Sequence, residues 1–257
     1  MKIVVLVKQV PDTYEERKLD TATGVLDREA SEPIIDEIVE RAIEVALSYK
    51  DSHKDTEIVL LSMGPDSVTA SLRKGLSLGA DSAVHVLDDG LRAADLVRTS
   101  AVLSAALSAT GYDLVIAGNE STDGRGGVMP AMLAERLGLP HLTSLDSVEI
   151  AADRISGVRE TENGTLDVHA ALPAIISITE RSPEVRFPNF KGILGAKKKP
   201  ITVMSLSAFD LASDLPTVRS VIVSTTQRPA RTAGTKIVDE GNAAAELTEF
   251  LAAGHLI

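Results

Sequence analysis

The chain has 257 residues and a formal net charge of −11, with 44% hydrophobic and 25% charged side chains. This is the composition of an ordinary soluble globular protein with one large or two small domains. The acidic balance argues against nucleic-acid binding, which usually needs a basic footprint. No apolar stretch approaches the roughly 18 residues that span a bilayer, so no membrane insertion is expected. The N-terminal apolar run is too short for a secretion signal, and cysteine is absent. Both features fit a cytoplasmic location, and the second excludes disulfides and thiolate catalysis.

Aromatic residues make up only 3% of the chain, so the core must consist of valine, isoleucine, leucine and alanine. Such a core suits a parallel sheet that is covered by helices. The first predicted strand is the apolar run Lys2–Val10, which Pro11 ends. A polar stretch follows, and then a helix that Ser31 can cap, with Pro33 in its first turn.

Strands and helices then alternate, which predicts βαβ units and a mostly parallel sheet. The next strands are Thr56–Met63, Ser82–Leu87 and Asp113–Ala117, and the helices between and after them are Asp66–Leu78, Ala93–Thr110 and Val128–Leu137.

The pattern changes after Pro140. Extended segments flank Asn163-Gly164, which is the strongest short signal for a β-hairpin. A buried strand covers Leu172–Thr179, and residues 181–200 have no periodicity. The sequence therefore predicts an α/β domain over residues 1–210, with a mostly parallel sheet that helices flank and a β-hairpin. A C-terminal arm over 211–257, with a short helix near Ala243–Ala253, completes the predicted chain.

Catalytic and metal-binding patterns are absent from the sequence. The five histidines are scattered, and no two of them have metal-ligand spacing. His85 and His169 lie inside predicted strands, where a structural role is the expected one. The serine motifs G-x-S-x-G and S-x-x-K do not occur. We therefore expect no catalytic residues and no metal.

The segment GNESTDGRGG, Gly118–Gly127, follows a predicted strand and precedes a predicted helix. Ligands of open parallel sheets bind beyond the carboxyl ends of the strands, which is the place of this loop. Its glycines can expose backbone amides, the next helix presents its positive end, and Arg125 adds a charge. The pattern fits a phosphate cradle, although a flexible surface turn explains it equally. Met63-Gly64-Pro65 and Leu6–Lys8 are expected to face the same crevice.

A second unusual stretch runs from Phe187 to Leu194 and precedes Lys197-Lys198-Lys199. It contains two of the four phenylalanines in a polar, aperiodic region. Exposed aromatic residues beside a basic run predict an anchor for a partner protein. A hydrophobic tuck under a loop, with solvated lysines, is the alternative.

Several motifs occur together and in one order: KIVVLVKQVPD, SMGP, GNESTDGRGG, RFPNFKGILGAKKKPI and ARTAG. This ordered set resembles the electron transfer flavoprotein beta-subunit family over essentially the whole chain. The resemblance implies an alpha-subunit partner that carries FAD. It also implies that the heterodimer takes electrons from flavin dehydrogenases, such as the acyl-CoA dehydrogenases of fatty acid oxidation, and passes them to a quinone-linked acceptor. For this chain itself the resemblance implies a Rossmann-like domain of the adenine-nucleotide-binding type, with AMP held in a structural role as its cofactor.

Carried over by position, the resemblance also implies the site residues. The AMP pocket would comprise Leu6, Glu32, Pro33, Ile34, Ile35, Met63, Ser121, Thr122, Asp123, Gly124, Arg125, Gly126, Gly127, Val128, Met129 and Met132. Relatives often have Asn-Pro where this chain has Glu32-Pro33. The recognition loop for dehydrogenases falls on about Glu180–Pro200 and would use Phe190, Ile193, Leu194, Lys197, Lys198 and Lys199. Phe190 takes the anchor position, which is commonly leucine in relatives. Either Thr13 or Tyr14 would approach the partner's flavin.

Three alternatives stay open at this point. Some relatives bifurcate electrons and hold a second FAD in place of AMP. An ATP-binding protein of similar fold would want an S-G-G-x-D-S loop after the first strand, where this chain has Gln9-Val10-Pro11-Asp12. An interaction scaffold with an empty pocket is the third.

Overall fold

The computed structural model describes residues 1–209, 211, 220–226 and 228–257. Its centre is a seven-stranded sheet in the order β12-β5-β4-β1-β6-β11-β7, in which neighbouring strands run parallel. These strands are β1 (Lys2–Leu6), β4 (Glu57–Met63), β5 (Ser82–Val86), β6 (Leu114–Gly118), β7 (His141–Leu145), β11 (Ala174–Ile178) and β12 (Ile201–Met204). The prediction of an α/β fold with a mostly parallel sheet is confirmed.

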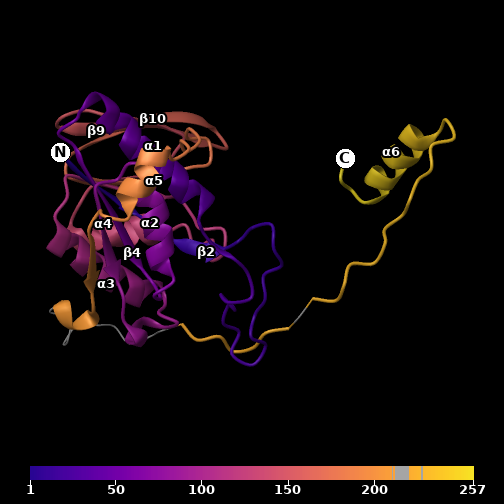
Figure 1. Cartoon of the computed structure of the whole chain (residues 1–257). Coiled ribbons are helices and arrows are strands. Elements are labelled where there is room, and N and C mark those ends of the chain that lie inside the picture. The colour runs from indigo at the N-terminus through magenta and orange to yellow at the C-terminus, as the bar shows by residue number, and fades with distance from the viewer. Residues whose placement is uncertain (210, 212–219, 227) are drawn as a thin grey trace.

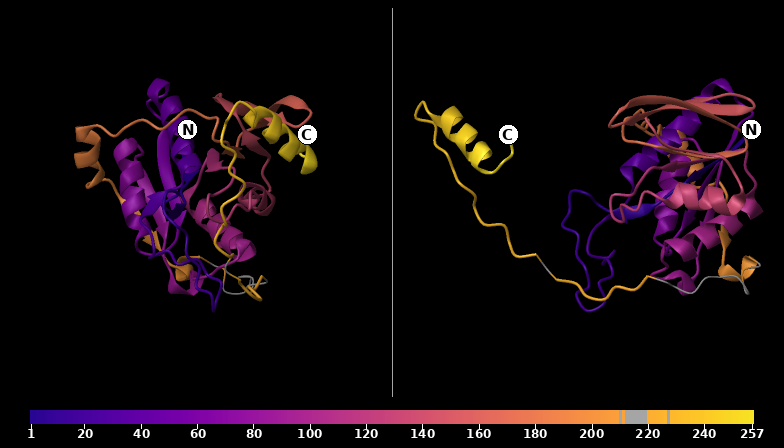
Figure 2. Two further views of the ribbon diagram at one scale, coloured as in Figure 1. Left: turned by 90° about the vertical axis from the view of Figure 1, so that its right-hand side faces the viewer. Right: turned by 180° about the vertical axis from the view of Figure 1, so that it is seen from behind.

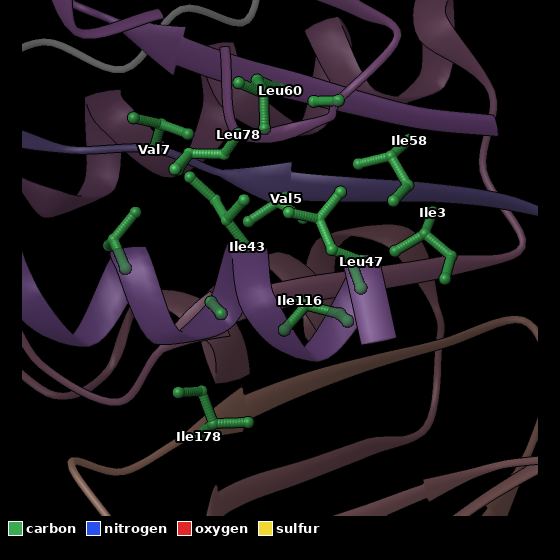
Figure 3. Packing of buried hydrophobic residues seen from close by; sticks show 14 of the residues in the cluster. Ile3, Val5, Val7, Ile43, Leu47, Ile58, Leu60, Leu78, Ile116 and Ile178 are labelled. Atoms are coloured by element: carbon green, nitrogen blue, oxygen red, sulfur yellow. The ribbon is translucent and has the colours of Figure 1, made fainter. Parts of the chain in front are cut away.

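Helices cover both faces of this sheet (Figure 1). They are α1 (Glu37–Ser52) and α2 (Val68–Leu78) on one face, and α3 (Leu96–Thr110) and α4 (Met129–Leu137) on the other. Successive strand residues point to opposite faces, so Ile3 and Val5 pack with α1 while Val4 and Leu6 pack with α3 and α4. Figure 3 shows the hydrophobic core on the face that α1 and α2 cover, where side chains of α1 lie against those of the strands.

The order of the strands reverses at β1. From β1 the chain moves outward to β4 and β5, and it then returns to the other side of β1 as β6. Such a reversal leaves a crevice at the carboxyl ends of the two central strands, because their connections leave in opposite directions. The segments that follow β1 and β6 therefore face each other across this crevice.

The first predicted strand is split in two. β1 ends at Leu6, and β2 (Gln9–Pro11) leaves the main sheet to pair antiparallel with β3 (Pro33–Ile35). This pair uses the extended backbone that proline favours. The prediction of one strand over Lys2–Val10 is therefore wrong from residue 7 onward.

The first predicted helix begins later than expected. α1 starts at Glu37, and the carboxylate of Asp36 accepts a hydrogen bond from the Ile38 amide and caps the helix. The predictions that Ser31 caps this helix and that Pro33 lies in its first turn are wrong, because residues 33–35 belong to β3.

A small antiparallel sheet follows β7 in the sequence. It consists of β8 (Ser147–Ile150), β9 (Arg154–Thr161) and β10 (Gly164–Ala171). Gly164, the first residue of β10 after the turn, has a φ of +129°, which a side chain would rarely allow. The predicted hairpin at Asn163-Gly164 is thus confirmed. Ile155 attaches this sheet to the core, where it is fully buried.

Two strands and one α-helix of the described structure lie where the sequence predicted no element. β7 and β12 are the two edge strands of the main sheet. α5 (Phe190–Ala196) lies in the stretch without periodicity, where it contacts α2.

The C-terminal segment leaves the sheet, as Figures 1 and 2 show. We call its described residues, 220–226 and 228–257, the arm; it ends in α6 (Ala243–Ala253), where no residue is buried. Hydrogen bonds join its first part to the core, from the Ser220 amide to Asp95 and from the Thr225 hydroxyl to the carbonyl of Thr21. The predicted boundary at 210 falls on a residue outside the described ones, as do 212–219 of the predicted arm.

Candidate functional site

The loop that follows β6, residues 119–128, lies beside the end of β1, and we call it the crevice loop. The ammonium group of Lys8 donates to the Ser121 hydroxyl at 2.9 Å and to the Asp123 carboxylate at 2.6 Å. These contacts join the segments that follow β1 and β6. The crevice loop is therefore held at the point where the strand order reverses.

A fully buried carboxylate attaches the crevice loop to α1. One oxygen of Asp36 accepts from the Ile38 amide, and the other accepts from the amide and the hydroxyl of Thr122 at 2.8 and 3.0 Å. A buried carboxylate is costly unless donors surround it, and here three donors do so. The loop and the start of α1 are thus held as one unit.

The Asp123 side chain is only 4% exposed and pairs with two cations. Arg28 lies 3.1 Å away, on the opposite carboxylate oxygen from Lys8. Burial alone would raise the pKa of this carboxyl, but the hydrogen bonds from Lys8 and Ser121 and the two positive charges lower it from 3.8 to about 2. Asp123 is consequently ionised in the folded protein at neutral pH.

The backbone of the crevice loop turns sharply before α4. Arg125 and Gly127 have φ values of +48° and +63°, a region that glycine enters without strain. α4 starts at Met129, and no side chain in the described part of the protein caps its first turn. Unpaired amides and the positive end of the helix dipole form a site that suits an anion.

Apolar residues of the predicted pocket lie at different depths. Leu6, Met63 and Met129 belong to the core cluster of α3 and α4, with Leu6 buried and the other two half-buried. Val128 and Met132 instead line a shallow hollow on α4. A second hollow, on the β8–β10 sheet, is lined by none of the predicted site residues.

The predicted pocket segment Glu32 to Ile35 coincides with β3 and the residue before it. Glu32 and Pro33 are exposed, Ile34 is half-buried, and Ile35 is 1% exposed and part of the core. This segment leads directly into Asp36, and so it is connected to the crevice loop through that carboxylate.

Sequence reasoning placed Leu6–Lys8 at the crevice but did not predict the contact of Lys8 with Asp123. It missed the other polar partners of the crevice loop, which include Arg17, Arg28 and Asp36. Arg17 donates to the carbonyl of Thr122. Lys8 lies 115 residues from its partner Asp123, and Asp36 lies 86 residues from Thr122. The single local signal was Asp36, a residue type that caps helices, directly before an apolar periodic run.

A second exposed cluster surrounds α5. We call it the α5 surface, and it consists of Phe187, Phe190, Ile193, Leu194, Lys197 and Lys198, all exposed. Phe187 is 96% and Phe190 76% exposed, so these rings do not form the hydrophobic tuck that the sequence also allowed. Exposed apolar patches of this kind mark interaction sites. Phe187 was not among the predicted partner-binding residues, although it is the more exposed of the two.

Lys199 faces away from this cluster. Its ammonium group donates to the carbonyls of Leu76 and Ala80 at 2.9 and 2.6 Å, at the end of α2. Burial there lowers the pKa of the Lys199 ammonium. The structure therefore gives Lys199 a helix-capping contact, which Lys197 and Lys198 do not share.

Arg186 fixes the chain just before the α5 surface. Its guanidinium contacts both oxygens of Glu44, with the shortest contact at 2.7 Å, and it reaches Asp51 at 2.8 Å. Burial would raise the pKa of the Glu44 carboxyl, but the hydrogen bonds from Arg186 outweigh burial and lower it. The hydrogen bonds that Arg186 donates to the carboxylates of Glu44 and Asp51 also raise the pKa of Arg186.

The structure separates the two candidates for approach to a partner's flavin. The Thr13 hydroxyl donates to the Glu37 carboxylate at 3.0 Å. Tyr14 is 94% exposed. Of the pair, Tyr14 is the side chain that is available to another protein.

The parallel sheet and the crevice at the carboxyl ends of its central strands define an α/β protein of the open-sheet class. No group of residues that could hold a metal ion occurs in the described part of the chain. No described helix has the length and apolar character that a bilayer span requires. A family model described as "Electron transfer flavoprotein domain" matches residues 23–209.

Comparison with curated proteins carries the identification further. The chain is 46% identical to "Electron transfer flavoprotein subunit beta" of Mycobacterium bovis over 99% of both chains. It is 32% identical to the protein of the same name from Syntrophomonas wolfei, over 98% of this chain and 96% of the relative. It is 33% identical to "Caffeyl-CoA reductase-Etf complex subunit CarD" of Acetobacterium woodii, over 79% and 78%. The chain therefore belongs to the electron transfer flavoprotein beta-subunit family.

Membership of this family makes the chain part of an electron carrier that involves a flavin and an alpha subunit. It sets aside the alternatives of an ATP-binding protein of similar fold and of a scaffold without a role in electron transfer. The predicted likeness to this family is confirmed.

Proposed function

We propose that the chain binds AMP in the crevice and pairs with an alpha subunit that carries FAD. The heterodimer accepts electrons from flavin dehydrogenases, such as the acyl-CoA dehydrogenases of fatty acid oxidation, and delivers them to a quinone-linked acceptor. The chain needs no catalytic residue in this role, because the flavin supplies the electron chemistry. Its lack of cysteine suits work in a reducing cytoplasm.

The observation that carries the AMP proposal is the crevice loop in front of an uncapped helix. Gly124, Gly126 and Gly127 are exposed next to the first turn of α4, where amides have no side-chain cap in the described protein. The Lys8 and Arg28 cations lie beside this loop. A phosphate group would take its hydrogen bonds from the amides and its charge balance from the helix end and the cations.

The arm supports the proposal of an alpha-subunit partner. Val221 and Val223 are 76% and 92% exposed, and Phe250 of α6 is 56% exposed. Apolar side chains along an extended segment gain burial only against another protein. We assign the arm to the alpha subunit and Tyr14 to the vicinity of that subunit's flavin.

The α5 surface supports the proposal of a dehydrogenase partner. Its exposed Phe187 and Phe190 would anchor the contact, and Lys197 and Lys198 would favour an acidic rim on the partner. A carrier that serves several donors needs a small interface that dissociates quickly, and a short helix with few anchors suits that need.

The decisive experiment is co-production with an alpha subunit, followed by denaturation of the purified complex and chromatography of the released nucleotides. We expect a yellow heterodimer that releases about one FAD and about one AMP per complex, the stoichiometry of one nucleotide site in each subunit. Release of about two FAD and no AMP would assign the chain to the bifurcating branch instead. A complex that releases neither AMP nor a second FAD would contradict the crevice assignment.

A variant of Asp36 tests whether AMP binds in the crevice. Asp36→Ala removes the acceptor of both Thr122 donors, so the crevice loop loses its attachment to α1. We expect the variant complex to keep FAD and to lose most of its AMP. Asp153→Ala, at an exposed carboxylate in the β8–β9 turn, is the control that should retain both nucleotides.

A further inference from the structure

α5 has seven residues, too few to hold a helical conformation by itself in water. Its first turn is capped within the loop, because the Asn189 side chain accepts a hydrogen bond from the Gly192 amide at 2.7 Å. Phe190 follows this cap directly. Both the conformation and the direction of the exposed rings therefore depend on what α5 packs against, which is α2.

The two helices approach each other closely at Gly192. A Cβ atom at this position would lie 2.4 Å from the carbonyl oxygen of Ser77. That oxygen belongs to the backbone of α2, so it cannot turn away as a flexible side chain could. Glycine is consequently required for this separation of the helices.

Basic side chains of α2 and of the segment after α5 donate hydrogen bonds to each other's backbone carbonyls. Arg73 of α2 donates to the carbonyls of Ala196 and Lys199 at 2.7 and 2.6 Å. Lys199, which follows α5, donates in turn to the carbonyls of Leu76 and Ala80. Each segment thus donates to carbonyls at or just after the C-terminal end of the other helix, where helix carbonyls lack the amides of a further turn. The Ala196 carbonyl also accepts from the Lys199 amide.

We propose that Gly192 and Arg73 are positioning residues for dehydrogenase docking. They fix α5 on α2, so that Phe187 and Phe190 project in one set direction from a rigid base. This inference rests on the proposed docking role of the α5 surface. It adds that the rings are oriented before the partner arrives, by residues that do not touch the partner.

An α5 that is already fixed before binding favours association with the dehydrogenase that donates electrons. A loop that must order on binding loses conformational entropy at that moment, whereas an ordered loop has already lost it on folding. A displaced α5 would therefore weaken the encounter with the dehydrogenase. Once the complex has formed, the distance between the two flavins and the electron-transfer step would stay the same.

A pair of glycine variants tests the proposal in the FAD-loaded heterodimer, with octanoyl-CoA-reduced medium-chain acyl-CoA dehydrogenase as donor. Gly192→Ala places a methyl group against Ser77, whereas a Cβ at Gly195 in the same helix meets nothing within 4 Å. Both substitutions raise helix propensity alike. We expect the KM for the Gly192→Ala heterodimer to exceed that for Gly195→Ala by about fivefold or more, with equal kcat and FAD content.

Arg73 provides a second test that does not depend on the fold of the Gly192 variant. Arg73→Ala should raise KM in the same way, because the carbonyls of Ala196 and Lys199 lose the Arg73 guanidinium, which links them to α2. Arg73→Lys keeps a cation within reach and should restore most of the loss. A purely structural role would instead lower the melting temperature or the FAD content without this split between KM and kcat.

Phe190→Ala and Phe187→Ala, measured in parallel, separate the two levels of the proposal. If these variants raise KM while Gly192→Ala matches Gly195→Ala and Arg73→Ala matches the parent, the positioning inference is overturned and the docking role stands. If none of the variants changes KM, the docking role of the α5 surface fails, and the positioning inference fails with it.

Discussion

Asp123 is a carboxylate that two cations from distant parts of the chain hold ionised inside the crevice loop. Lys8 lies between β1 and β2, and Arg28 lies in the long segment between β2 and β3. The Asp123 side chain is nearly buried, whereas the Lys8 and Arg28 side chains are 44% and 45% exposed, so solvent screens the two ion pairs in part. The position of the loop therefore depends on the charge of this one group.

This dependence predicts a stability change with pH. The pKa of Asp123 is about 2 in the folded protein, against 3.8 for the free side chain. The unfolded chain thus binds the proton first, so the contribution of Asp123 is present above about pH 4 and is lost as the pH falls towards about 2. Asp123→Asn should cost about 2 kcal/mol of unfolding free energy near pH 7 and almost nothing near pH 2.

Urea unfolding of the parent chain and of the variant at a series of pH values measures this difference. Asp153→Asn, at an exposed carboxylate, is the control. A cost of Asp123→Asn that stays constant as the pH falls would contradict the electrostatic explanation.

A second prediction concerns the exposed side chain of Phe190. Phe190→Ala should raise the KM of a reduced dehydrogenase for the heterodimer by about tenfold, the effect of one lost anchor of about 1.4 kcal/mol. FAD content should not change, because Phe190 projects from the core with 76% of its surface exposed. Leu166→Ala on β10, an exposed apolar residue outside the α5 surface, is the control in stopped-flow and steady-state assays.

Some residues of the site could be predicted from a short window of sequence, and others could not. The glycines of the crevice loop could be predicted because glycine between a strand and a helix has a meaning in a short window of sequence. Lys8 and Asp36 could not, because their roles depend on contacts with Asp123 and Thr122 that form only when β1, α1 and β6 come together. Lys199 was grouped with its two lysine neighbours, although its side chain points the other way, into α2.

At the scale of elements, buried strands and long helices were predicted well because each carries its own period. β4, α2 and the β9–β10 hairpin agree with the sequence within a few residues. β2 and β3 have three residues each and exist only as a pair, so neither has a period of its own. α5 was missed for a similar reason, because the contacts that hold it come from α2.

Arg186 connects the stretch before α5 to α1 and makes a prediction about these elements. Its guanidinium contacts Glu44, which is 8% exposed and would lose its main partner on substitution. Arg186→Gln should lower the free energy of unfolding by about 1–2 kcal/mol. In a double-mutant cycle with Glu44→Gln, we expect a coupling energy of about 1 kcal/mol from urea unfolding. A coupling energy near zero would show that the pair does not hold these segments together.

At the scale of the whole molecule, the chain consists of a packed α/β body and an arm whose terminal helix, α6, has no buried residue. Figure 2 shows the distance between α6 and the sheet. The hydrogen bonds made by Ser220 and Thr225 lie at the start of the arm, far from α6 in sequence. The stability of the body should accordingly owe little to the arm.

Deletion of residues 220–257 tests this division. We expect the melting temperature of the isolated chain to change by less than about 5 °C, since few contacts are lost. Co-purification with the alpha subunit should fall by at least about tenfold, because the arm supplies the apolar contacts proposed for the partner. Deletion of 243–257 alone, which removes α6 and the residues after it, should give an intermediate loss. A truncated chain that still forms the yellow complex would contradict the role of the arm.

The exposure of the arm also matters for the life of the protein in a cell. Val221, Ile222 and Val223 are consecutive β-branched residues, each more than half exposed. Short segments of this kind can pair with copies of themselves, and extended backbone is readily cut by proteases. A copy made without its partner would thus be removed or would aggregate, while an assembled copy would be protected. The level of the carrier would then follow the scarcer of its two subunits.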